Sequence, residues 1–184
     1  VRSLEHLPDA DAIAERTASG LGLTRPELAV LLAYTKITCT QEIVASDLPD
    51  DAFAHAALVD YFPTALRERF ASAMAEHPLR REIIATQLAN QLANYSGITF
   101  ANRVAIETTA STADIVRAHT ATRRAFQVDE LWADIEALDD AVSSDAQTAT
   151  LLVVRQLLDR ATRWFLTNRR PPIDVHETVA QLQP

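Results

Sequence analysis

The sequence predicts an all-α protein, a multi-helix bundle of about nine helices with no significant sheet, and three observations lead to this prediction. Apolar residues recur every three or four positions along most of the chain, which is the period of a helix face. Proline, glycine and short polar residues stand where such segments start and stop. Glycine occurs only 3 times in 184 residues, although tight strand turns and phosphate-binding loops both depend on it.

The first two helices are marked by their end signals. A short helix is expected within residues 8–20, which open with proline and acidic residues and close with glycine. Thr24 as N-cap and Glu27 three residues later form a capping box for a long helix that runs to about Ala45. Residues 28–33 of this helix are apolar nearly all round, so we expect them to be deeply buried.

Two further helices are expected over residues 53–62 and 64–76, after a polar turn at 47–51 and with Pro63 between them. Each carries apolar residues at helical spacing, so each should bury one face. The side chains expected to face inward are Phe53, Ala57, Leu58 and Tyr61 in the first helix and Leu66, Phe70, Ala73 and Met74 in the second.

The helix expected from Pro78 to Ser96, with Gly97 just past its end, is the central packing element. One stripe of this helix is apolar and consists of Ile84, Leu88, Leu92 and Tyr95. A second stripe consists of the amides Gln87, Asn90, Gln91 and Asn94. Amides donate and accept hydrogen bonds, which suits a polar contact between packed elements. The alternative is a solvated face, because Asn and Gln are mostly exposed.

The sequence of the second half of the chain predicts five more helices. They are expected over 98–109, from the capping pattern at 111–114 to about Phe126, over 130–138, over 146–169, and from Asp174 to near Leu182. The buried side of the long helix is expected to hold Leu151, Leu152, Val154, Leu157, Leu158, Ala161, Trp164 and Phe165, with Arg155 and Asp159 paired on its surface. The break at Ser96–Gly97 also allows a single domain, 1–184, to be divided into two packed halves, 1–96 and 97–184.

Composition excludes several classes of protein. The net charge of −8 argues against a surface that binds nucleic acid or an anionic membrane. The single cysteine excludes an intramolecular disulfide and fits a reducing, cytoplasmic compartment. No apolar run approaches the roughly 20 residues of a membrane span, and the first residues lack the features of a signal peptide. Because the chain begins with Val1, we expect it to be a piece of a longer polypeptide.

No residue pattern in the sequence predicts a catalytic, cofactor-binding or metal site. The pair Gly20 and Gly22 lacks the third glycine and the preceding strand of a dinucleotide fingerprint. The five histidines are scattered singly, without metal-ligand spacing. Cys39 lies inside a helical segment and is expected to be a small core residue, and Lys36, the only lysine, is expected to lie at the surface.

Four pairs of arginines are expected to be solvated charges or charges at helix ends, although some could contact a partner. They are Arg67 with Arg69, Arg80 with Arg81, Arg123 with Arg124, and Arg169 with Arg170. Trp132, Trp164 and Phe165 are expected in the core.

Several stretches of the sequence are distinctive. In order, these are GLTRPELAVLLAYTK at 22–36, DYFP at 60–63, LRERF at 66–70, HPLRREIIAT at 77–86 leading through Asn94 to GITF at 97–100, ATRWFL at 161–166 and NRR at 168–170. Together they resemble the C-terminal helical region of the large bacterial NAD-specific glutamate dehydrogenases. The resemblance covers nearly the whole chain, and the stretches are long and unusual in combination.

The resemblance implies a non-catalytic C-terminal domain of a longer enzyme that interconverts glutamate with 2-oxoglutarate and ammonia, using NAD. The catalytic domains would lie upstream and bind NAD, so no catalytic residue is assigned here and this part of the enzyme should hold no cofactor. The domain would pack against those upstream domains or a neighbouring subunit of a homo-oligomer. Candidate contact residues are Arg80, Arg81, Gln87, Asn90, Gln91 and Asn94. The alternative is an independent regulatory or scaffold module that binds a protein or a small effector.

Overall fold

The computed structural model describes residues 4–182, and over this range the chain forms helices without any strand, as the sequence predicts. The expected number of about nine helices becomes ten in this range. They are α1 (Ala10–Ala18), α2 (Arg25–Val44), α3 (His55–Tyr61), α4 (Thr64–Ala75), α5 (Arg80–Ser96), α6 (Phe100–Thr108), α7 (Thr112–Ala125), α8 (Val128–Glu136), α9 (Ser144–Asn168) and α10 (Val175–Leu182). Two 3-10 turns, Leu48–Asp50 and Ala52–Ala54, join α2 to α3.

Side-chain caps start the helices where the sequence places them. The backbone N–H of Thr24 donates to Glu27 Oε2 at 2.7 Å, and the Thr24 hydroxyl accepts from the Glu27 N–H, which completes the capping box. The Ser111 hydroxyl caps α7 by accepting from the Asp114 N–H, and the Asp174 carboxylate caps α10 by accepting from the Glu177 N–H. Helix α5 begins at Arg80, two residues later than expected, so Pro78 precedes the helix.

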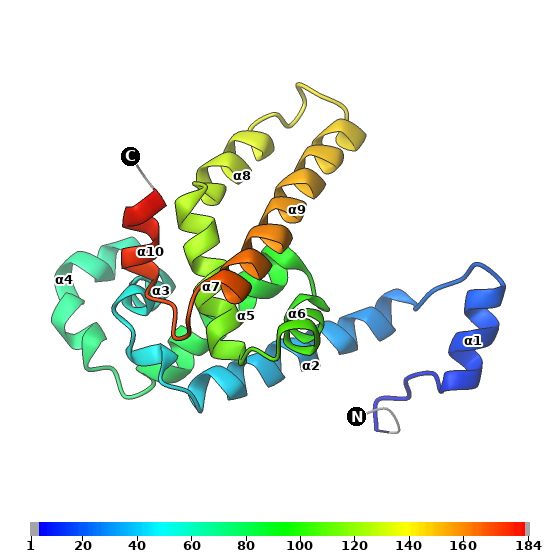
Figure 1. Cartoon of the computed structure of the whole chain (residues 1–184), viewed down its shortest axis with the longest axis horizontal. Coiled ribbons are helices and arrows are strands. Elements are labelled where there is room, and N and C mark those ends of the chain that lie inside the picture. The colour runs from blue at the N-terminus through cyan, green and yellow to red at the C-terminus, as the bar shows by residue number, and fades with distance from the viewer. Residues whose placement is uncertain (1–3, 183–184) are drawn as a thin grey trace.

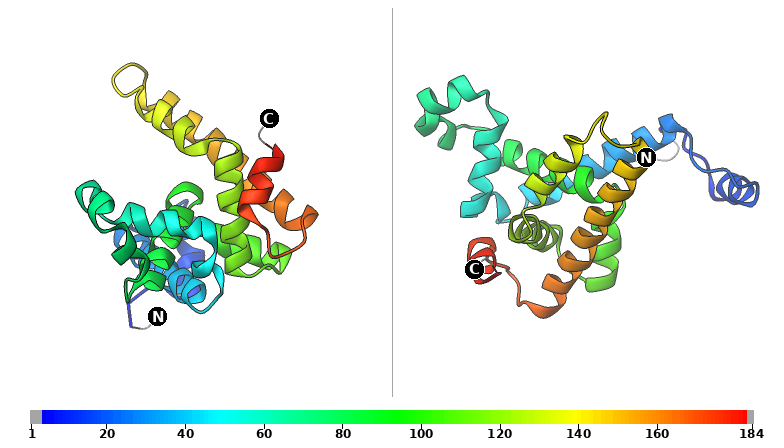
Figure 2. Two further views of the ribbon diagram at one scale, coloured as in Figure 1. Left: turned by 90° about the vertical axis from the view of Figure 1, so that its left-hand side faces the viewer. Right: turned by 90° about the horizontal axis from the view of Figure 1, so that it is seen from above.

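Helix α5 lies at the centre of the fold, packed against α2 and α3 and also touching α6, α7 and α9 (Figures 1 and 2). Its predicted apolar stripe is largely confirmed, because Ile84, Leu88 and Leu92 are buried and Tyr95 is partly buried. The main core cluster joins Leu88 to Phe100, on the other side of the Gly97 break. The division into two halves stays a prediction.

The expectation that residues 28–33 are deeply buried is wrong. None of them is buried, and Leu28 is 43% exposed. The reason is that the first part of α2 extends away from the body of the molecule and carries α1 at its end (Figure 1), so that the other helices of residues 4–182 cover it only in part. Helix α1 itself has no buried residue.

The inward face predicted for α4 is also wrong in part. Met74 is buried, but Leu66, Phe70 and Ala73 are exposed. Helix α4 packs against α3 and projects beyond it (Figure 1), and its backbone is non-helical at Phe70. An apolar helix face stays exposed when no neighbouring element lies opposite it. Tyr61, at the end of α3, is exposed for the same reason.

Helix α9 buries a narrower face than predicted. Its buried residues are Val154, Leu158, Thr162 and Phe165, whereas Leu152 and Trp164 are about half exposed. The expected pairing of Arg155 with Asp159 is also wrong. Asp159 pairs with Arg163, one turn further along α9, and with Arg103 of α6, while the guanidinium of Arg155 lies against Gly97.

Gly97 occupies a backbone conformation that other residues avoid, with φ 88° and ψ 163°. A Cβ built on it would lie 2.2 Å from Nη2 of Arg155. We therefore expect Gly97→Ala to lower the free energy of unfolding by about 1–3 kcal/mol, mainly through backbone strain. Urea unfolding of the 184-residue chain measures this change.

Gly22→Ala is the matched control for this substitution. Gly22 has no atom within 4 Å of a built Cβ, so we expect no loss and at most a gain of about 1 kcal/mol from a less flexible unfolded chain. Equal effects of the two substitutions would contradict a special role for Gly97.

Candidate functional site

The candidate site is the polar network around α7, the helix that is most enclosed by others. Helices α2, α5, α6, α8, α9 and α10 all touch α7, so its polar side chains are removed from water. Arg117, His119 and Arg123 are all buried. Buried polar groups require partners, because leaving them unpaired costs about 1–3 kcal/mol each.

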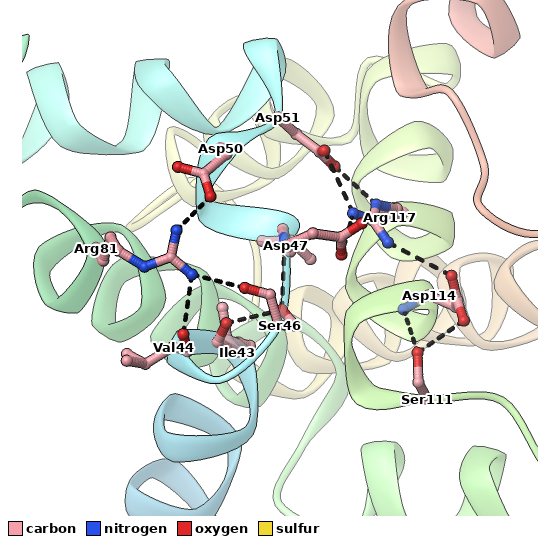
Figure 3. A network of polar contacts seen from close by, with 11 residues as sticks. Ile43, Val44, Ser46, Asp47, Asp50, Asp51, Arg81, Ser111, Asp114 and Arg117 are labelled. Carbon is pink, nitrogen blue, oxygen red and sulfur yellow. Dashed lines mark hydrogen bonds and ion pairs between the residues drawn. The ribbon is translucent and has the colours of Figure 1, made fainter.

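Arg117, 4% exposed, binds three carboxylates. Its Nε donates to Asp51 Oδ2 at 2.7 Å and its Nη2 to Asp47 Oδ1 at 2.8 Å, and Asp114, one turn before it, lies 3.5 Å away (Figure 3). Ser111, the N-cap of α7, in turn donates to Asp114 at 2.7 Å. One guanidinium thus connects α7 to the 47–51 segment.

The ion pairs change the pKa of Asp47 and of Arg117. The hydrogen bond from Arg117 lowers the pKa of Asp47. Burial opposes the charged form of Arg117, but hydrogen bonds from its guanidinium to Asp51 and Asp47 outweigh burial and raise its pKa. Both shifts favour the charged forms of Asp47 and Arg117.

Arg81 holds the opposite side of the same segment from α5. Its Nη2 donates to the backbone carbonyls of Val44 at 3.0 Å and Ser46 at 2.6 Å, and its Nη1 donates to Asp50 (Figure 3). Arg80 donates to Asp50 at 2.5 Å, and these two arginines lower the pKa of Asp50. The carbonyls of Val44 and Ser46 are at the C-terminal end of α2, where intrahelical donors run out, so a cation is favourable there.

Two of the four amides of α5 also have partners within the domain. Gln91 accepts from Nη1 of Arg123 at 2.8 Å, and Asn94 accepts from Nζ of Lys36 at 3.3 Å. Gln87 and Asn90 are partly exposed and make no side-chain hydrogen bond to any residue in 4–182. Two of the four amides therefore make side-chain hydrogen bonds inside the domain, and the other two make none within residues 4–182.

Arg123 joins α7 to α8 and α5. It donates to Asp129 at 2.5 and 3.1 Å, and its guanidinium carbon lies 4.4 Å from the centre of the Tyr95 ring. Tyr95 also packs edge-on against Trp132. Arg123 is therefore an internal cross-link, although the sequence predicted a solvated charge or helix-end charge for most arginines.

Ser96 and His119 form a pair that resembles a nucleophile with its base. Ser96 Oγ lies 3.0 Å from His119 Nε2, but both residues are at most 2% exposed. Burial, and then repulsion by Arg123, lowers the pKa of His119 to about 3. The imidazole is neutral and enclosed, so a substrate cannot reach the hydroxyl, and the pair serves packing.

Neither a metal site nor a reactive thiol is formed within residues 4–182. No cluster of three or more His, Cys, Asp or Glu residues in this range could hold a metal ion. Cys39 is buried, as expected, and burial raises the pKa of its thiol to about 11. The described helices also include none that is long and apolar enough to cross a membrane.

Sequence reasoning missed Arg117, His119 and Ser96, and found Arg123 only as a member of an arginine pair. One local signal was present, because Asp114 stands three residues before Arg117, which places the two on the same helix face. The other partners of Arg117 lie 66 and 70 positions away in the chain. The network links helices that are far apart in the sequence.

Comparisons with known proteins show which family the chain belongs to. Residues 20–184 match the family described as "Glutamate dehydrogenase, C-terminal". The chain is 44% identical to the NAD-specific glutamate dehydrogenase of Halomonas elongata over 91% of its length, 40% identical to that of Pseudomonas aeruginosa over 100%, and 43% identical to that of Mycobacterium tuberculosis over 95%. These matches cover 10%, 11% and 11% of the three relatives. The chain, which spans about a tenth of the length of these relatives, belongs to the family of glutamate dehydrogenase C-terminal regions.

Proposed function

We propose that this chain is the C-terminal helical domain of an NAD-specific glutamate dehydrogenase. The complete enzyme would convert glutamate, NAD and water into 2-oxoglutarate, ammonia and NADH. The observation that carries the proposal is the match of residues 20–184 to the C-terminal family, together with relatives that bear this enzyme's name. Catalysis and NAD binding are assigned to the other domains, since the chain spans only about a tenth of the length of these relatives.

Within the enzyme, the domain packs against the catalytic core or a neighbouring subunit of a cytoplasmic homo-oligomer. Two features support this role. The polar network around α7 makes the body of the domain a cross-linked unit. Large apolar side chains on α2 and α4 remain exposed, which is typical of surfaces that meet another part of a larger protein.

The six candidate contact residues fall into two groups. Arg80, Arg81, Gln91 and Asn94 bind other residues of the domain. Replacing them would alter the domain itself as well as any external contact. Gln87 and Asn90 have no such internal partner in residues 4–182, so they provide the cleaner test.

We expect Gln87→Ala with Asn90→Ala to destabilise the full-length enzyme by about 1 kcal/mol for each hydrogen bond lost to a neighbouring domain. In the 184-residue chain the same pair should change the free energy of unfolding by less than about 0.5 kcal/mol. The measurements are thermal denaturation, oligomeric state and turnover of the full-length enzyme. Gln156→Ala, at an exposed amide of α9, is the control. Unaltered stability, assembly and turnover would remove both amides from the contact surface.

A second candidate function is a regulatory module, and one observation favours it. A groove of about 380 Å³ lies between α2 and α6, lined by apolar and polar side chains that include Leu31, Tyr34 and Asn102. Such a groove could accept a small effector. A rise in the denaturation temperature of the 184-residue chain with a free amino acid or nucleotide would favour this function.

A further inference from the structure

We propose that the arm, defined as residues 4–37, is the surface on which the preceding part of the full-length polypeptide packs. The arm consists of α1, the turn after it and the first part of α2, and it projects from the body of the domain (Figure 1). This inference rests on the proposed function and assigns to it a surface and an occupant.

The apolar character of α2 is the first argument. Between Leu28 and Thr40 the only charged residue is Lys36, and a helix that is apolar on nearly every side is normally buried. Yet Leu28 is 43% and Ile37 is 49% exposed. Ile13 and Leu21 extend the same exposed apolar character to α1 and the turn.

The arm is an ordered element, which is the second argument. Nη1 of Arg16 donates to both carboxylate oxygens of Glu27, at 3.0 Å to Oε1 and 2.8 Å to Oε2. This ion pair links α1 to the start of α2. This pair, together with hydrogen bonds from the Thr24 cap, lowers the pKa of Glu27 to about 2. The ion pair and the capping box both act at the junction of α1 and α2, and together they favour one orientation of α1 relative to α2.

The route of the chain identifies the occupant. Glu5 accepts a hydrogen bond from the hydroxyl of Tyr34 at 2.7 Å, so the chain enters the domain beside the middle of α2. The relatives are about ten times longer than this chain, and the matching family is a C-terminal one. The remaining polypeptide of such an enzyme would therefore join the domain at the arm.

A tether of this kind favours the same chain over a second copy. A segment joined at residue 4 has an effective concentration in the mM range next to the arm. A second copy or a separate protein would have to reach the same surface from solution.

The test places a photoreactive benzoylphenylalanine at Leu28 or at Ile37 of the full-length enzyme. We expect cross-links to residues that precede this domain, in a product that migrates as one polypeptide on a denaturing gel. The same group at Val153, a 63% exposed residue of α9 on the body of the domain, is the control and should give little of this product.

Three outcomes would overturn the inference. Products with the mass of two polypeptides would assign the arm to a neighbouring subunit. An absence of cross-links at both arm positions would mean that the arm is solvated. If the group at Val153 gave the same yield of cross-links to the preceding segment as the groups in the arm, the reaction would be unspecific. Deleting the whole domain tests the proposed function separately. Lost enzyme stability on deletion, without cross-links from the arm, would leave the packing role standing and reject this surface.

Discussion

Arg117→Ala is expected to lower the free energy of unfolding of the 184-residue chain by about 2–3 kcal/mol. Removing one member of a buried ion pair typically costs about 3–5 kcal/mol, and we take a smaller value because Asp47 is exposed and can be rehydrated. The substitution also releases Asp51 and removes the link between α7 and the 47–51 segment. Urea unfolding measures the change.

Two further variants separate this effect from the loss of any arginine. Arg117→Lys retains the positive charge but has no planar fork to join two carboxylates, so it should recover only part of the loss. Arg103→Ala removes an arginine that is paired with Asp159 and is 44% exposed, and it should cost less than about 1 kcal/mol. Similar losses for Arg117→Ala and Arg103→Ala would mean that burial of the network contributes nothing.

His119 is expected to make the domain less stable as the pH falls below about 6.5. Its folded-state pKa of about 3 lies below the ordinary value of 6.5, because burial and Arg123 disfavour the charged ring. Between these two values the unfolded chain binds a proton that the folded chain does not bind. Stability is therefore lost as the pH falls from 6.5 towards 3, by at most about 1.4 kcal/mol for each pH unit.

The variant His119→Gln isolates this contribution. Glutamine can still hydrogen-bond the Ser96 hydroxyl but does not titrate. The free energy of unfolding of the variant should therefore fall less steeply between pH 6 and pH 4 than that of the protein with His119. The expected difference between the two proteins over this range is about 2–3 kcal/mol. Above pH 7 the two curves should run parallel, with a constant offset from changed packing against Phe100. Parallel curves down to pH 4 would show that His119 is protonated in the folded state.

Helix ends are the part of this fold that sequence reasoning predicted well. Thr24, Ser111 and Asp174 start helices in the structure as expected, and Gly97 ends α5 with a positive φ. Each of these signals acts through hydrogen bonds between residues at most three or four positions apart. The family resemblance was also readable, because whole stretches of sequence carry it.

The extent of burial was predicted less well. The apolar runs at 28–33 and at Leu66 and Phe70 suggested burial, and the structure leaves none of these residues buried. Periodicity identifies which face of a helix is apolar, but a covering element must lie opposite that face before it is buried. For the arm and for α4 the other elements of residues 4–182 cover the apolar side chains only in part.

The polar network was decided by the tertiary structure alone. Arg117 and Arg123 have charges that the sequence reports, but their burial and partners depend on segments that meet only after folding, such as Asp51 and Gln91. The sequence by itself determined the all-α class, the helix ends and the family, since these follow from local hydrogen bonding and residue order. Which arginines became internal links, and which apolar faces stayed open, followed from how the helices pack, because desolvation and pairing are properties of the assembled neighbourhood.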